Sequence, residues 1–232
     1  MHHLVLTPDR NRPPENDFSG AFEPESIRYK AFHEGRGDTV TIQRIHAAPS
    51  RSRREVLRDV QSAIQATRFN ALAFMCHGTI NWLQLGLSSG SATGLQSLAE
   101  TAAMIAASAP PDLRVILYAC SSGRAGAPGD TAPGTGENSF ADHFRDALCA
   151  AGCVNISVYA HTSAGHTTRN PDIRVFRGLG LPSGGVGGMY LVRPGTRPQY
   201  STLARLLRSN TPTPLRFEYP FLTIEEIHAR LV

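Results

Sequence analysis

The segment Ala71-Leu-Ala-Phe-Met-Cys76, followed directly by His77-Gly78, decides the fold class of this chain. Six apolar residues in a row, ended by a polar residue and a glycine, are typical of a strand buried on both faces, as in a parallel sheet. The segment Val115-Ile-Leu-Tyr-Ala119, followed by Cys120, has the same character. Parallel strands need a crossover between them, and a helix beginning near Thr93, with apolar residues at helical spacing, supplies it.

The same alternation continues on both sides of these two segments. A capping box, Ser52-Arg-Arg-Glu55, predicts the start of one helix, and apolar residues spaced along 140–151 predict another. Residues 8–25 hold four prolines and are predicted to be a loop. The order predicts an α/β fold of three layers, with helices on both faces of a mostly parallel sheet of about six strands. The four further strands are expected at His3–Thr7, Thr39–Ile45, Asn155–Ala160 and Met189–Val192.

The length of 232 residues suits one large domain with a short appendage. We expect the main domain to span residues 1–200. Residues 201–232 are expected to form a C-terminal extension packed on that domain, with two short amphipathic helices near 202–209 and 223–231.

Composition excludes several classes of protein. The net charge of +4 is small and the arginines are dispersed along the chain, so we expect no nucleic-acid partner. No run approaches the ~20 apolar residues of a membrane span, and the first residues lack the pattern of a secretory signal. The four cysteines include no CxxC pair. These features favour a cytoplasmic chain with reduced thiols and no membrane partner.

The two buried segments end in residues that can react together. Parallel strands present their carboxyl ends at one edge of the sheet, so His77 and Cys120 are expected to face one substrate. A thiolate is a strong nucleophile, and a nearby imidazole can stabilise it or protonate a leaving amine. Gly78 lets the backbone come close, and the N–H groups of Gly78 and Cys120 are candidates for an oxyanion hole.

These residues resemble the signature of caspase-like cysteine peptidases, in which one hydrophobic block ends in His-Gly and a second ends in Ala-Cys. The family includes caspases, metacaspases, gingipain-type enzymes, separases and bacterial CHAT domains. Cys120 follows His77 by 43 positions, near the ~50 of caspases. The second block is most similar to the Ser-Ala-Cys-x-Thr-Gly pattern of CHAT domains, with Tyr118 and Ser122 as departures.

The resemblance implies a caspase-like fold and a cysteine endopeptidase. Cys120 would be the nucleophile that forms a thioester, and His77 the general acid and base. The expected partner is a protein or peptide substrate, and the resemblance implies one defined protein in a bacterial regulatory or defence pathway. No cofactor is expected, although calcium activates some relatives. The alternative is a catalytically idle protein of the same fold that binds a protein partner.

Other polar residues and thiols receive lesser roles. His161 follows a strand end, and Asp172 is an acidic residue near the expected cleft loops; both are candidates for lining the substrate cleft. A zinc site made of His77, Cys120 and His161 is conceivable from residue types alone, but no motif supports it. The three other thiols are interpreted as packing residues: Cys76, Cys149 and Cys153.

Residues 121–137 hold five glycines and two prolines and are predicted to form a mobile loop directly after the nucleophile. The resemblance implies an activation role for this loop. If the enzyme prefers basic residues before the scissile bond, Arg124 is the expected site of self-cleavage; if it prefers acidic ones, Asp130 and Glu137 are the candidates. The residues that would set this preference stay open: Asp130, Glu137, Asp142 and Asp172 for a basic one, and Arg169, Arg174 and Arg177 for an acidic one.

Overall fold

The structure is a computed structural model, and it describes residues 1–9, 22–46, 51–85, 93–94, 98–124, 138–161, 173–178 and 189–192. Several features expected from the sequence lie outside these ranges. They are the two helices of the C-terminal extension, residues 125–137 of the expected loop, and Asp172.

Within the described ranges, the central element is a seven-stranded sheet with the order β10-β9-β8-β7-β3-β1-β2. The five neighbouring strands from β8 to β2 are parallel, and β9 pairs antiparallel with both of its neighbours, β8 and β10. The α/β class with a mostly parallel sheet is therefore confirmed. The strands are β1 (His2–Pro8), β2 (Thr39–Ile45), β3 (Ala71–Met75), β7 (Arg114–Tyr118), β8 (Ser157–His161), β9 (Ile173–Arg177) and β10 (Met189–Val192).

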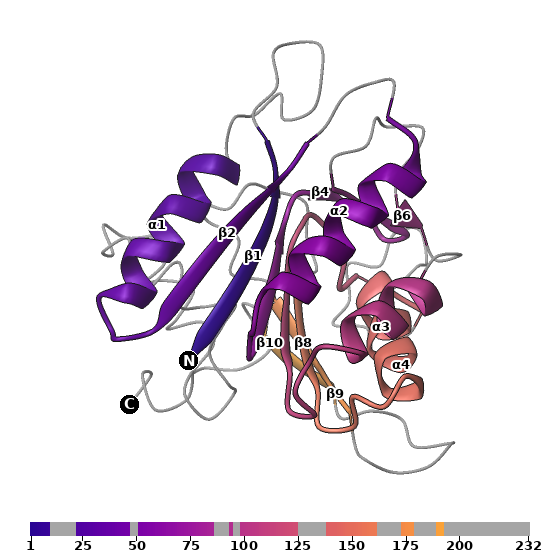
Figure 1. Cartoon of the computed structure of the whole chain (residues 1–232). Coiled ribbons are helices and arrows are strands. Elements are labelled where there is room, and N and C mark those ends of the chain that lie inside the picture. The colour runs from indigo at the N-terminus through magenta and orange to yellow at the C-terminus, as the bar shows by residue number, and fades with distance from the viewer. Residues whose placement is uncertain are drawn as a thin grey trace, which may run out of the picture.

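In the part of the chain that the structure describes, four helices pack against this sheet, on opposite sides of it in Figure 1. Helix α1 lies beside β2 and β1, and the other three lie together on the other side. Side chains along a strand alternate between the two faces of the sheet. Leu72, Phe74 and Cys76 therefore share one face, and they belong to the same core cluster as residues of α2, α3 and α4. The helices are α1 (Phe22–Glu34), α2 (Arg53–Ala66), α3 (Leu98–Ala106) and α4 (Phe140–Ala150).

A small second sheet lies at the end of β3. It consists of three short antiparallel strands: β4 (His77–Gly78), β5 (Trp82–Gln84) and β6 (Thr93–Gly94). Thr93 was expected near the start of a helix, but it belongs to β6, and α3 begins at Leu98. Antiparallel pairing with β5 thus overrides the capping tendency of Thr93.

Helix α1 corrects a second expectation. Residues 8–25 were predicted to be a loop, yet the helix begins at Phe22, because a proline is tolerated in a first helical turn. Its buried residues are Phe22, Ser26, Tyr29 and His33. That spacing is helical, but two of the four side chains are polar, so the sequence shows no apolar stripe.

Within the described ranges, no helix is both long and apolar enough to cross a membrane.

Candidate active site

The register between β3 and β7 brings His77 and Cys120 to the same edge of the sheet. The two strands are parallel neighbours, and their last paired residues are Met75 and Tyr118. His77 and Cys120 each follow two residues later along the chain. The imidazole and the thiol therefore come from equivalent positions at the carboxyl ends of adjacent strands.

Gly78 permits the two strand ends to approach closely. A Cβ atom at this position would lie 2.8 Å from Ala119 Cβ and 3.2 Å from Leu83 Cδ2, and the first distance is below any normal carbon contact. Only glycine fits here without a shift of its neighbours. The backbone directly after His77 thus packs against the residue directly before Cys120.

The small sheet holds the histidine segment. His77 pairs with Gln84 and Gly78 with Leu83, while the N–H of Thr79 donates to the carbonyl of Trp82 at 2.9 Å. The imidazole of His77 is half-buried, and its ring centroid lies 4.9 Å from that of Phe22 in an edge-on contact. Helix α1 therefore contributes its first residue to the surroundings of His77.

A tight turn holds the cysteine segment at residues 121–124, which form the start of the expected loop. Ser121 has a φ of 55°, in the left-handed region that a non-glycine residue seldom adopts. The N–H of Gly123 donates to the carbonyl of His161 at 2.8 Å, and the N–H of Arg124 donates to the carbonyl of Ser121 at 3.0 Å. Backbone strain of this kind is often found beside reactive residues.

The first turn of α4 ties both segments together. The N–H of Phe140 donates to the carbonyl of Ile80 at 3.1 Å, three residues after His77. The N–H of Ala141 donates to the carbonyl of Ser122 at 2.9 Å, two residues after Cys120. These are N–H groups that a helix start leaves without partners in the helix itself, so the start of α4 fixes both strand ends.

No family model matches the chain. No curated protein matches it either.

The structure separates Cys120 from the other thiols. Cys120 is half-buried at the strand edge, whereas Cys76 is fully buried and belongs to the apolar core. Burial raises the pKa of the Cys76 thiol well above its usual range, which keeps it protonated and inert. Burial also raises the pKa of Cys149 and of Cys153, both of which pack with the core.

His161 lies beside the cysteine turn but is buried. Its ring is 5.4 Å from the ring of Tyr118 in an edge-on contact, and its carbonyl accepts the Gly123 hydrogen bond. With only 5% of the residue exposed, His161 is placed to support the turn, and contact with a substrate stays a prediction. Arg124 is half-buried where the turn ends, so it is near the site as expected.

Asp142 has a structural role in α4. Its carboxylate pairs with Arg145 at 2.6 Å and accepts a hydrogen bond from the N–H of Asn138 at 3.0 Å. A buried arginine needs such a partner, and Asp146 supplies a second carboxylate at 2.6 Å. Asp142 is therefore engaged within its own helix, which leaves it less suited to bind a basic substrate side chain.

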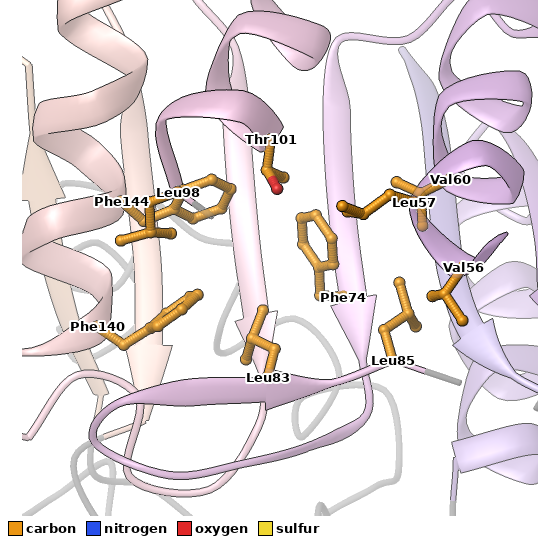
Figure 2. A pocket seen from close by; sticks show the side chains of 10 residues that line it. All are labelled: Val56, Leu57, Val60, Phe74, Leu83, Leu85, Leu98, Thr101, Phe140 and Phe144. Carbon is orange, nitrogen blue, oxygen red and sulfur yellow. The ribbon is translucent and has the colours of Figure 1, made fainter. Parts of the chain in front are cut away.

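A separate apolar pocket lies between the sheet and helices α2, α3 and α4 (Figure 2). Its cavity volume is only about 20 Å³, and Phe74 lies near its centre. Neither His77 nor Cys120 lines it. Figure 2 shows the hydroxyl of Thr101 directed into this space. The other lining side chains are all Val, Leu or Phe, so we interpret the pocket as part of the apolar core.

Proposed function

We propose that this protein is a cysteine endopeptidase that cleaves a peptide bond through Cys120 and His77. The observation that carries the proposal is the equivalent placement of the two residues after the adjacent strands β3 and β7. The half-buried state of both residues adds support, because a nucleophile must be reached by its substrate.

Each group has a defined part in this mechanism. The Cys120 thiolate attacks the carbonyl carbon of the scissile bond, and the carbonyl oxygen becomes an oxyanion near the N–H groups of Gly78 and Cys120. His77 gives a proton to the departing amine, which leaves a thioester on Cys120. Water, deprotonated by His77, then hydrolyses the thioester and releases the acid product.

We further propose that the fold is the caspase-like one. Two observations favour it: the strands that precede the histidine and the cysteine are neighbours in the middle of the sheet, and helices lie on both sides of that sheet. The alternative is a catalytically idle protein of the same fold that binds a protein partner. It predicts the same placement of His77 and Cys120 but no cleavage of peptides.

A cleavage assay with a peptide library tests the proposal. The parent protein should cleave a subset of peptides, and both Cys120→Ala and His77→Ala should lose ~10³-fold or more of that activity while keeping the circular dichroism spectrum of the parent. Cys149→Ala, which removes another half-buried thiol on α4, is the matched control and should retain activity.

Turnover by Cys120→Ala at the parent rate would refute the mechanism. A parent protein that cleaves no peptide in the library but still captures a protein partner would support the idle alternative. Mass spectrometry after treatment with an acyl electrophile adds a direct readout, because the label should be on Cys120 and should depend on His77.

A further inference from the structure

A compact cluster of residues that can bind a metal ion lies at the amino-terminal ends of the strands, opposite to the candidate active site. His3 is near the start of β1, His33 is in the last turn of α1, and Asp38 directly precedes β2. His3 pairs in register with Ala71, the first residue of β3, whereas His77 follows the last residue of that strand. The cluster and the Cys–His pair are thus at opposite ends of the parallel strands.

The ligand atoms of the cluster lie close enough together to surround one ion, and one pair of them, from His33 and Asp38, is hydrogen-bonded. His33 Nδ1 lies 3.1 Å from Asp38 Oδ2, and His3 Nε2 lies 3.4 Å from the same oxygen. One ligand atom from each residue lies within 4.8 Å of the other two. Zinc bonds of about 2.0–2.1 Å in a tetrahedral site place neighbouring ligand atoms about 3.3 Å apart, so small side-chain movements suffice.

Burial favours an ion at this place. His3 is 3% exposed and His33 is 8% exposed. His3 Nε2 is buried and makes no hydrogen bond with the required alignment, although it is aimed at the Asp38 carboxylate. Its contact with Asp38 Oδ2 is long for a hydrogen bond, and a cation shared by the two atoms would replace this contact with two metal bonds. The Asp38 side chain is 21% exposed and offers a route from solvent.

The surrounding groups hold the three residues in position. His3 Nδ1 is hydrogen-bonded to the hydroxyl of Tyr29, which leaves Nε2 as the nitrogen that faces the cluster. Metal-bound histidines usually have such an outer partner on the second nitrogen. The N–H of Asp38 donates to the carbonyl of His33 at 3.1 Å, across a turn in which Gly37 has a φ of 87°. The amino group of Met1 binds Asp38 Oδ1 at 2.8 Å, on the other oxygen of the carboxylate.

We propose that His3, His33 and Asp38 bind one divalent transition-metal ion of the zinc class. Two imidazoles and one carboxylate are a ligand set that zinc commonly uses. The ion would add a link between β1, α1 and β2, which already meet here through the pairing of β1 with β2 and the hydrogen bonds of Asp38. We assign it a structural role because the site is remote from His77 and Cys120. The inference is independent of the proposed peptidase activity.

Metal titration of the tag-free full chain tests the proposal. After treatment with a chelator, the parent should bind one equivalent of Zn²⁺, gain thermal stability with Zn²⁺, and show the visible absorption bands of tetrahedral Co²⁺ when Co²⁺ is added. His33→Gln and Asp38→Asn should bind Zn²⁺ more weakly by at least ~100-fold. Tyr29→Phe should keep the ligands and lose roughly 10–100-fold in affinity.

His46→Gln is the matched control. His46 also contacts a carboxylate, Asp9, at 2.7 Å, but its side chain is 60% exposed and no second histidine joins the pair in the part of the chain that the structure describes. This variant should bind Zn²⁺ as the parent does. Equal Zn²⁺ affinity in Asp38→Asn and the parent, or loss of binding in His46→Gln alone, would overturn the proposal. If a ligand variant fails to fold, the Co²⁺ spectrum of the parent protein decides the question. A parent that shows no tetrahedral Co²⁺ bands would mean that the three residues form a hydrogen-bonded network and bind no metal.

Discussion

Gly78 carries a packing constraint that should be visible in both stability and activity. Gly78→Ala places a Cβ 2.8 Å from that of Ala119, so the strand ends must move apart. Overpacking of this kind costs about 1–3 kcal/mol, and the displacement of His77 relative to Cys120 should lower peptidase turnover more than tenfold. Thermal melting and the peptide assay measure the two effects. The double variant Gly78→Ala with Ala119→Gly restores the space and should recover part of both; no recovery would mean that the glycine acts in another way.

The thiols should differ in reactivity because they differ in burial. Iodoacetamide at neutral pH is expected to modify Cys120 first, while Cys76 stays unmodified in the folded protein because burial raises its pKa and blocks access. Peptide mapping after a short exposure identifies the modified residue. Modification of Cys76 before Cys120 would contradict the placement of both thiols.

At the scale of elements, the start of α4 links helix stability to the site. Ser139 is the N-cap of this helix, and its side chain accepts a hydrogen bond from the N–H of Asp142 at 3.2 Å. Ser139→Ala should cost about 1 kcal/mol of folding free energy and should also lower turnover, because Phe140 and Ala141 bind the two site segments.

Ser52→Ala is the matched control for this prediction. Ser52 caps α2 in the capping box that the sequence predicts, and its cap hydrogen bonds are made with Glu55 of the same helix. Its loss should lower stability to a similar extent and leave turnover unchanged. Equal losses of turnover in both variants would show that global stability, and not the start of α4, governs the site.

The apolar pocket offers a stabilising substitution in α3. The hydroxyl of Thr101 is buried without a hydrogen-bond partner in the described structure. Thr101→Val keeps the shape and removes the unsatisfied group, so it should raise stability by about 1 kcal/mol, measured by denaturant unfolding. Thr101→Ser keeps the hydroxyl but loses the methyl group, and it should be less stable than the parent. A destabilised Thr101→Val would indicate an ordered water that binds this hydroxyl.

The elements that could be predicted from the sequence are those with a strong local pattern. The apolar runs that end at Cys76 and Ala119 identified β3 and β7, and Ser52 with Glu55 identified the start of α2. Strands of two or three residues, such as β4 and β5, have no periodicity to detect. Strand β9, Ile173–Arg177, is short and was not predicted, because Arg174 and Arg177 were interpreted as candidates for setting an acidic substrate preference.

At the scale of the whole molecule, the sequence predicted that two strand ends meet, but not how the helices dock on the sheet. The placement of His77 and Cys120 at one edge followed from the rule that parallel strands end together. The pairing of Phe140 and Ala141 with the two strand ends depends on where α4 docks, which no local pattern encodes. The cluster of His3, His33 and Asp38 was missed for the same reason, because it joins three elements.

The hydrogen bonds at the start of α4 have a consequence for a chain that is cut. A backbone break after Arg124 would leave β7 in one fragment and α4 with β8 in the other, yet β7 and β8 pair over four residues and α4 still binds Ile80 and Ser122. Two polypeptides, 1–124 and 125–232, expressed together should therefore assemble into one particle that elutes with the uncut protein in size-exclusion chromatography. Self-cleavage, if it occurs at Arg124, would then pass unnoticed in a native separation and show only under denaturing conditions, in the parent and not in Cys120→Ala. Fragments that fail to copurify would mean that covalent continuity, and not these contacts, holds the halves together.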